Sequence, residues 1–236
     1  MEIKMIIKKM RLVYQWLKIA FPTKEQFGSC GKNTILLYPL RIYNPQSVFI
    51  EDNVKLSSGL HILNSPTEKV IIKKYTVFAA NCTIAPNSHV STVTVPQFLL
   101  GASHVNDHST DIIIDEDVWL GTGVTILSGV HIGRGCIVGA GSLVTKSLPP
   151  YSVAVGSPAR IIKKTFTVEQ ILRHEQNLYS ENERMTRQQL EYNEHAFFEN
   201  KGTYGTEAGL DVDALLRIDR IKKMFHFIEP GQDDNG

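Results

Sequence analysis

Branched apolar residues recur at every sixth position through the middle of this 236-residue chain. From residue 114 onward the positions are Ile114, Leu120, Ile126, Ile132, Val138 and Val144. A helix repeats its buried face every 3.6 residues and a half-buried strand every two, so a period of six is typical of neither as a long element. It is typical of short strands separated by sharp corners, where glycines such as Gly123 and Gly135 relieve the backbone. The repeat predicts an all-β solenoid whose stacked turns enclose one apolar side chain per face.

The same period is present earlier in the chain, with two interruptions. The aligned positions are Ile50, Leu56, Ile62, Ile72, Phe78 and Ile84. The ten-residue step from Ile62 to Ile72 indicates a small insertion, which contains Glu68. Residues 89–110 lose the pattern, although the step from Ile84 to Ile114 is still a multiple of six. We therefore expect an extruded loop over 89–110, and long loops in compact domains usually carry function.

Three segments are predicted: an N-terminal amphipathic helix over 1–27, the solenoid over 28–164, and a helical extension over 165–236. The first segment mixes lysines with apolar residues and lacks the features of a signal peptide or a membrane span. Packing over one end of the solenoid is favoured, and contact with a membrane surface is the alternative. In the extension, Thr167 and Gln170 have the spacing of a capping box. Helical periodicity continues over 184–199 and 211–228.

Charge and cysteine content limit the classes of partner. The 25 Lys and Arg residues nearly balance 24 Asp and Glu residues, so no nucleic-acid partner is expected. Three cysteines (Cys30, Cys82 and Cys136) lack the spacing of metal ligands, which favours a reducing, cytoplasmic setting.

The segment DIIIDEDVWLGTGVTILSGVHIGRGCIVGAGSLVTKSLPPYSVAVGSPARIIKK, residues 111–164, resembles the hexapeptide-repeat acyltransferase family. The likeness is to its sugar O-acetyltransferases and its xenobiotic, streptogramin-type acetyltransferases. This resemblance implies a left-handed parallel β-helix, a homotrimer and acetyl-CoA as the acetyl donor. It also implies a hydroxyl acceptor on a sugar or polysaccharide unit of a capsule, exopolysaccharide or lipopolysaccharide, with a xenobiotic acceptor as the alternative.

Acetyl transfer to a hydroxyl requires a base, and histidine is suited to that role near neutral pH. The extruded loop contains His89, His104 and His108. By resemblance we expect His89 to be the base, because residues 78–81 (FAAN) match the corner that precedes the family's catalytic histidine. A second such corner at residues 85–87 (APN) would favour His104 instead.

The resemblance also implies a set of acetyl-CoA contacts. Trp119 would lie beside the acceptor and the pantetheine arm. Corner residues Thr122, Ala140, Thr145 and Lys146 would contact the pantetheine, and the basic residues Arg160, Lys163 and Lys164 would meet the nucleotide phosphates. A backbone N–H near Gly121 or Gly139 is expected to stabilise the oxyanion.

Two hypotheses from other classes compete with this one. His104, His108 and Asp107 could form a metal site of the γ-carbonic-anhydrase type, but their spacing differs from that family's and no metal is expected. A non-catalytic β-helix scaffold is the other. It would not require a loop histidine, Trp119 and a basic cluster together.

Overall fold

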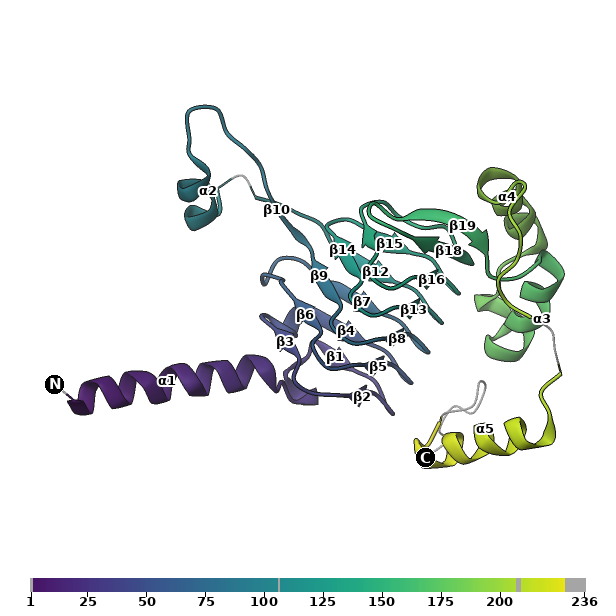
Figure 1. The fold of residues 1–236 in the computed structure, drawn as a ribbon, viewed down its shortest axis with the longest axis horizontal. Helices are drawn as coiled ribbons and strands as arrows, with labels where there is room; N and C mark the ends of the chain where they lie inside the picture. The colour runs from purple at the N-terminus through teal and green to yellow at the C-terminus, as the bar shows by residue number, and fades with distance from the viewer. Residues whose placement is uncertain (1, 106, 207–208, 228–236) are drawn as a thin grey trace.

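A computed structural model describes residues 2–105, 107–206 and 209–227. Its body is a stack of short strands arranged in three sheets, with helices at both ends of the chain (Figure 1). Neighbouring strands in these three sheets run parallel, except for the last pair of sheet B. The predicted stacking of short parallel strands is confirmed.

Successive strands enter the three sheets in turn. Sheet A contains β1 (Ser29–Cys30), β4 (Val48–Ile50), β7 (Val70–Ile72), β12 (Ile112–Ile114) and β15 (His131–Ile132). Sheet B contains β2 (Ile35–Leu36), β5 (Lys55–Leu56), β8 (Val77–Phe78), β13 (Trp119–Leu120), β16 (Ile137–Val138), β18 (Ser152–Val155) and β19 (Arg160–Lys164). Sheet C contains β3 (Arg41–Ile42), β6 (His61–Ile62), β9 (Thr83–Ala85), β14 (Thr125–Leu127) and β17 (Leu143–Val144). Up to β17, each coil therefore gives one strand to each sheet, and the coil has three edges, which we call A–B, B–C and C–A.

The residues of the six-residue repeat form the core inside this stack. Ile114, Leu120, Ile126, Ile132, Val138 and Val144 are all fully buried. Cys82 and Cys136 are buried in the same core. Burying a side chain of this size stabilises a fold by about 1.5–3 kcal/mol, so the repeat supplies the main favourable contribution to folding.

The A–B and B–C edges have a constant geometry. Residues with left-handed backbone stack at the A–B edge: Asn33, Asn53, Tyr75, Asp117, Gly135 and Tyr151. At the B–C edge they are Gly59, Asn81, Gly123 and Gly141. Apart from Asn33 in the first coil, each of these residues donates its N–H to a carbonyl of the adjacent coil, as from Asp117 to Lys74 (3.0 Å) and from Gly123 to Ala80 (2.9 Å). Corner and strand hydrogen bonds together therefore fix the register of the coils.

The C–A edge is variable, and both interruptions of the repeat lie on it. Three residues (128–130) connect Leu127 to His131 across this edge, whereas twenty-six (86–111) connect Ala85 to Ile112. The longer segment contains β10 (Asn87–His89), α2 (Gln97–Ser103) and β11 (Asp107–Ser109), and it projects from the body (Figure 1). The extruded loop expected over 89–110 is therefore a partly regular element whose first strand begins at Asn87.

Helix α1 (Glu2–Ala20) extends away from the base of the stack (Figure 1). Side chains from Met5 to Lys18 are exposed, Ile19 is partly buried and Ala20 is fully buried. The prediction that this helix packs over one end of the solenoid is wrong for the chain by itself, because only its last residues reach the body. No described helix combines the length and apolar character needed to cross a bilayer.

In the described part of the chain after the coil, the α-helices are α3 (Val168–Leu178), α4 (Arg187–Phe197) and α5 (Val212–Met224), and a 3-10 helix, η3 (Glu181–Glu183), lies between α3 and α4. The predicted capping box is confirmed, since the Gln170 N–H donates to Thr167 Oγ1 and the Thr167 N–H donates to Gln170 Oε1.

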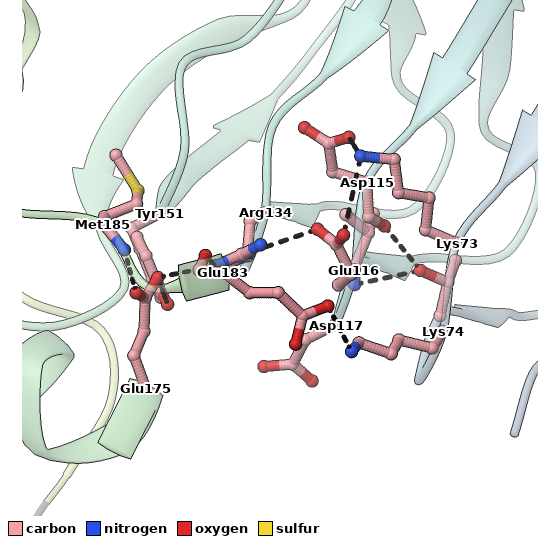
Figure 2. A network of polar contacts seen from close by, with 12 residues as sticks. Lys73, Lys74, Asp115, Glu116, Asp117, Arg134, Tyr151, Glu175, Glu183 and Met185 are labelled. Carbon is pink, nitrogen blue, oxygen red and sulfur yellow. Dashed lines mark hydrogen bonds and ion pairs between the residues drawn. The ribbon is translucent and has the colours of Figure 1, made fainter. Parts of the chain in front are cut away.

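A polar network joins α3 to the A–B edge (Figure 2). Arg134 Nε lies 3.1 Å from Glu116 Oε2, and its Nη1 lies 3.2 Å from Glu175 Oε1. The Tyr151 hydroxyl donates to Glu175 at 2.9 Å, and burial with this neighbouring charge raises the pKa of Tyr151. Because the Glu175 side chain is nearly inaccessible to water, these partners provide the hydrogen bonds that water would otherwise make to it. The network fixes the extension to an edge other than the one that carries the extruded segment.

Candidate functional site

The extruded segment begins and ends as an antiparallel hairpin. Its register places His89 opposite Asp107 and Ser88 opposite His108. Since side chains alternate between the two faces of a strand, His89 and Asp107 share one face while His108 lies on the other.

Asp107 holds two histidines at once. His89 Nδ1 lies 2.6 Å from Oδ1, and His104 Nδ1 lies 2.8 Å from Oδ2. The hydrogen bonds from His89 and then His104 lower the pKa of Asp107, so its carboxylate is held in the charged form. A carboxylate only accepts hydrogen bonds, so Nδ1 of each neutral ring carries the proton and Nε2 remains able to accept one. This is the tautomer that a general base requires.

The two histidines differ in their setting. His89 belongs to a paired strand and its side chain is 45% exposed. His104 is the C-cap of α2, with φ 56° and a side chain that is 68% exposed. His89 is therefore held by backbone pairing as well as by Asp107. Of the two, it is the more constrained.

The metal-ligand set suggested by the sequence is wrong in one member. Within the ranges that the structure describes, the group with ligand atoms close together, within 4.8 Å, is His89, His104 and Asp107. His108 is absent from it because the hairpin register directs position 108 to the opposite face. Both Nδ1 atoms are hydrogen-bonded to Asp107, which is the geometry of oriented bases.

The expected acetyl-CoA contacts occupy other edges of the coil. Trp119 is on the outer face of sheet B and 58% exposed. Thr122 and Ala140 are successive corners of the B–C edge, joined by the Gly141 N–H, which donates to the Thr122 carbonyl at 2.8 Å. Thr145 and Lys146 are exposed and follow β17, toward the C–A edge. No described contact joins any of these residues to His89 or Asp107.

The oxyanion donor was expected among the backbone N–H groups near Gly121 or Gly139, and those of the two glycines themselves are already paired. The Gly121 N–H donates to the Val138 carbonyl at 2.8 Å, and the Gly139 N–H donates to the Ala154 carbonyl at 2.9 Å. Both groups take part in the ladder between coils, so neither is available to a substrate. Glycine at 121 has a steric cause, because a Cβ there would lie 2.6 Å from the Ala140 nitrogen of the adjacent coil.

The basic residues of the predicted phosphate site all lie on β19. Arg160 and Lys163 are exposed. The Lys164 ammonium is instead paired with the Glu194 carboxylate of α4. Two of the three cations are therefore presented to solvent on β19.

Sequence reasoning did not find the orienting role of Asp107. Asp107 lies opposite His89 and therefore on the same face of the hairpin. This relation can be recognised only once the register of the two strands is known. It also did not find a function for Glu68, which lies buried beside the base of the hairpin.

Comparisons with known proteins agree with this architecture. The family model for bacterial transferase hexapeptide (six repeats) matches residues 111–146. The chain is 32% identical over 141 residues to a candidate acetyltransferase of Saccharomyces cerevisiae, covering 60% of this chain and 68% of that protein. It is 33% identical over 142 residues to a galactoside O-acetyltransferase of Escherichia coli, covering 60% and 66%. The alignments therefore span about two thirds of each relative.

Other similarities concern the fold and the acceptor. A solved galactoside acetyltransferase in complex with coenzyme A aligns with a TM-score of 0.56 at 26% identity, covering 76% of this chain and 88% of that one. A shorter match, 46% identical over 59 residues, is to a chloramphenicol acetyltransferase of Klebsiella aerogenes and covers 25% of this chain and 28% of that protein.

Proposed function

The chain belongs to the hexapeptide-repeat acetyltransferase family, and on this basis we propose that it transfers the acetyl group of acetyl-CoA to a hydroxyl of a sugar or polysaccharide unit. The observation that carries the proposal is the pair formed by His89 and Asp107 on a hairpin that projects from the coil. Capsular, exopolysaccharide and lipopolysaccharide units are the acceptors we favour.

In the proposed mechanism, His89 is the general base. Asp107 fixes the ring through Nδ1, and Nε2 takes the proton of the acceptor hydroxyl. The acceptor oxygen attacks the thioester carbonyl, a C–O bond forms and the C–S bond breaks. The imidazolium returns its proton to the departing thiolate. The carboxylate of Asp107 stabilises the transient imidazolium by its charge. His104 shares Asp107 and is the alternative base.

The donor would lie along the outer face and edges of the coil. Arg160 and Lys163 present cations suited to phosphates, and Trp119 presents an indole. Within one chain, Thr122 and Ala140 occupy the B–C edge whereas His89 is carried on the C–A edge. A site that uses both sets needs a second copy of the chain beside the first. This supports a homotrimer of left-handed β-helices with active sites between subunits.

A xenobiotic acceptor is the second candidate. Its support is the chloramphenicol acetyltransferase match, which covers a quarter of the chain and falls short of the coverage of the sugar enzymes. Acceptor turnover distinguishes the two.

We also propose a cytoplasmic location with peripheral membrane contact through α1. Met10, Val13 and Leu17 are exposed apolar residues, and Trp16 is half exposed. Lys8, Arg11 and Lys18 share one helical face, and no acidic residue occurs between residues 3 and 24. A basic amphipathic helix of this kind suits an anionic lipid surface. The fraction of protein that sediments with anionic vesicles should be lower for a Lys8→Glu, Arg11→Glu variant than for the wild type. If the wild type sediments equally with neutral and with anionic vesicles, this proposal is contradicted.

The test of the function is thiol release from acetyl-CoA against sugars, oligosaccharides and streptogramins. We expect release that depends on a saccharide acceptor and is abolished by His89→Ala. Loss only in His104→Ala would assign the base to His104. Absence of both turnover and acetyl-CoA binding would favour the scaffold hypothesis.

A further inference from the structure

Glu68 is a buried carboxylate that the proposed mechanism does not use. It lies in the insertion at the C–A edge between β6 and β7, and its relative exposure is 2%. None of the ion pairs among the residues that the structure describes involves it. A buried charge without a cationic partner must be stabilised by hydrogen bonds.

The hydrogen bonds come from both sides of the edge. Within the insertion, the Ser65 N–H donates to Oε2 at 2.8 Å, the Ser65 hydroxyl lies 2.7 Å from both oxygens, and the Thr67 hydroxyl donates to Oε1. From the hairpin, the Ser109 side chain adds to the lowering of the carboxylate pKa, and the N–H of Lys69, next to Glu68, donates at 2.8 Å to Asp111 Oδ1, two residues beyond Ser109. Burial alone would raise the pKa of Glu68, but the hydroxyl and amide donors together outweigh it and lower the pKa to about 2, so the carboxylate is ionised at neutral pH.

Ser109 connects Glu68 to the candidate base. It is the last residue of β11, two positions after Asp107, and therefore on the same face of the strand. Its partner across the hairpin is Asn87, two positions before His89. The contact with Glu68 thus holds the Asn87–Ser109 rung, which is two rungs from the His89–Asp107 rung and is the nearest rung on the same face of the hairpin.

The insertion is itself anchored to the coils. Asn64 and Asn44 exchange three hydrogen bonds of 2.6–3.1 Å. On the other side, the Lys69 N–H donates to Asp111 Oδ1 at 2.8 Å. Glu68 is therefore a fixed point between the rigid coil and a segment that projects from it.

We propose that Glu68 is a positioning residue: through Ser109 it fixes β11, and thereby holds Asp107 and His89 in the geometry for proton transfer. The proposal rests on the proposed function, because it takes the hairpin to carry the base. Misplacement of a base by about 1 Å can reduce a rate by about a hundredfold. Loss of the anchor should therefore reduce kcat more than it changes KM for acetyl-CoA.

The chain offers a matched control. Glu183 also follows a serine by three residues, accepts from the Ser180 N–H and hydroxyl, and has a pKa lowered to about 2, in its case chiefly by Lys74. It lies in the network at the A–B edge (Figure 2). Glu183→Gln removes a comparable hydrogen-bonded charge without touching the hairpin.

The experiment measures kcat, KM for acetyl-CoA and amide hydrogen exchange in Glu68→Gln, Ser109→Ala, their double variant, Glu183→Gln and His89→Ala. We expect Glu68→Gln and Ser109→Ala each to reduce kcat by about ten- to a hundredfold with little change in KM. The reduction of kcat in the double variant should be no greater than the larger of the two single reductions, because the two substitutions remove the same link. Exchange at residues 87–89 and 107–109 should rise in these variants and stay unchanged in Glu183→Gln.

Unchanged exchange in the hairpin of both single variants would overturn the anchor. Increased exchange with wild-type kcat, while His89→Ala is inactive, would overturn the positioning role. Additive losses in the double variant would show that Glu68 does not act through Ser109. If Glu68→Gln does not fold, Ser109→Ala still decides. Wild-type kcat in His89→Ala would instead contradict the proposed base, which is a separate result.

Discussion

His89 lies directly opposite Asp107 in the β10–β11 hairpin, and its Nδ1 is 2.6 Å from the Asp107 carboxylate. A carboxylate bonded to one ring nitrogen fixes the orientation of the ring and leaves the other nitrogen for chemistry. The pair is created by strand register across a segment in which the six-residue repeat is lost.

The first prediction concerns the base itself. His89→Ala should reduce kcat by about 100- to 10,000-fold, the usual contribution of a positioned general base. His108→Ala is the control, since His108 is exposed on the same hairpin but lies on its other face. Steady-state thiol release and size-exclusion chromatography would check rate and assembly together. Equal losses in both variants would indicate damage to the hairpin rather than removal of a base.

A second prediction follows from the uneven settings of the three cations on β19. Removing an exposed cation that meets a phosphate should raise KM for acetyl-CoA, and added salt should diminish the difference. We expect this for Lys163→Ala. Lys164→Ala should raise KM less, because its ammonium is already paired with Glu194. KM for acetyl-CoA would be measured from initial rates at two ionic strengths. A larger rise in KM for Lys164→Ala than for Lys163→Ala would contradict the assignment of Lys163 as a phosphate contact.

A third prediction tests the contact between coils. Gly121→Ala places a Cβ against the Ala140 backbone nitrogen and should lower the free energy of unfolding by about 1–3 kcal/mol, as overpacking does. Gly101→Ala in α2 has open space around it and should be neutral or slightly stabilising. Thermal unfolding of the two variants provides the comparison. A stable Gly121→Ala protein would mean that the adjacent coils can separate.

The fourth prediction concerns acid stability. The hydrogen bonds to Glu68 lower its pKa from an ordinary 4.5 to about 2. Because the folded-state pKa is the lower one, the stabilisation is fully present above pH 4.5 and is lost as pH falls toward 2. Its limit is about 3 kcal/mol.

Urea unfolding of wild type and Glu68→Gln over that interval is the measurement. The difference between the two free energies should narrow as pH falls from 4.5 toward 2. A difference that is constant over the interval would show that the carboxylate gains no stabilisation from its charge.

The sequence predicts the coil well because one physical cause sets its pattern. Each coil contributes one apolar side chain per face to a common core. Ile114 and Ile132 fill successive layers of that core, and for this reason they pair in sheet A and lie a multiple of six residues apart. The capping box at Thr167 was equally predictable, because its partners are only three residues apart.

Long-range polar contacts were not predictable in this way. Arg134 appears as one polar position of the repeat, and nothing local indicates that it bonds Glu175, forty-one residues later. The role of Asp107 depends on the register of the hairpin. The exposure of α1 depends on where the helix lies, since only its last residues contact the body. Each of these features is set by tertiary geometry.

The contrast among the three edges has an evolutionary consequence. Two edges have a fixed crossing length and a column of left-handed residues, so an added residue there would shift the register of everything above it. The C–A edge accommodates connections of three to twenty-six residues within this one chain. New acceptor specificities can therefore arise by exchanging segments at that edge, while the apolar tube and its folding remain unchanged.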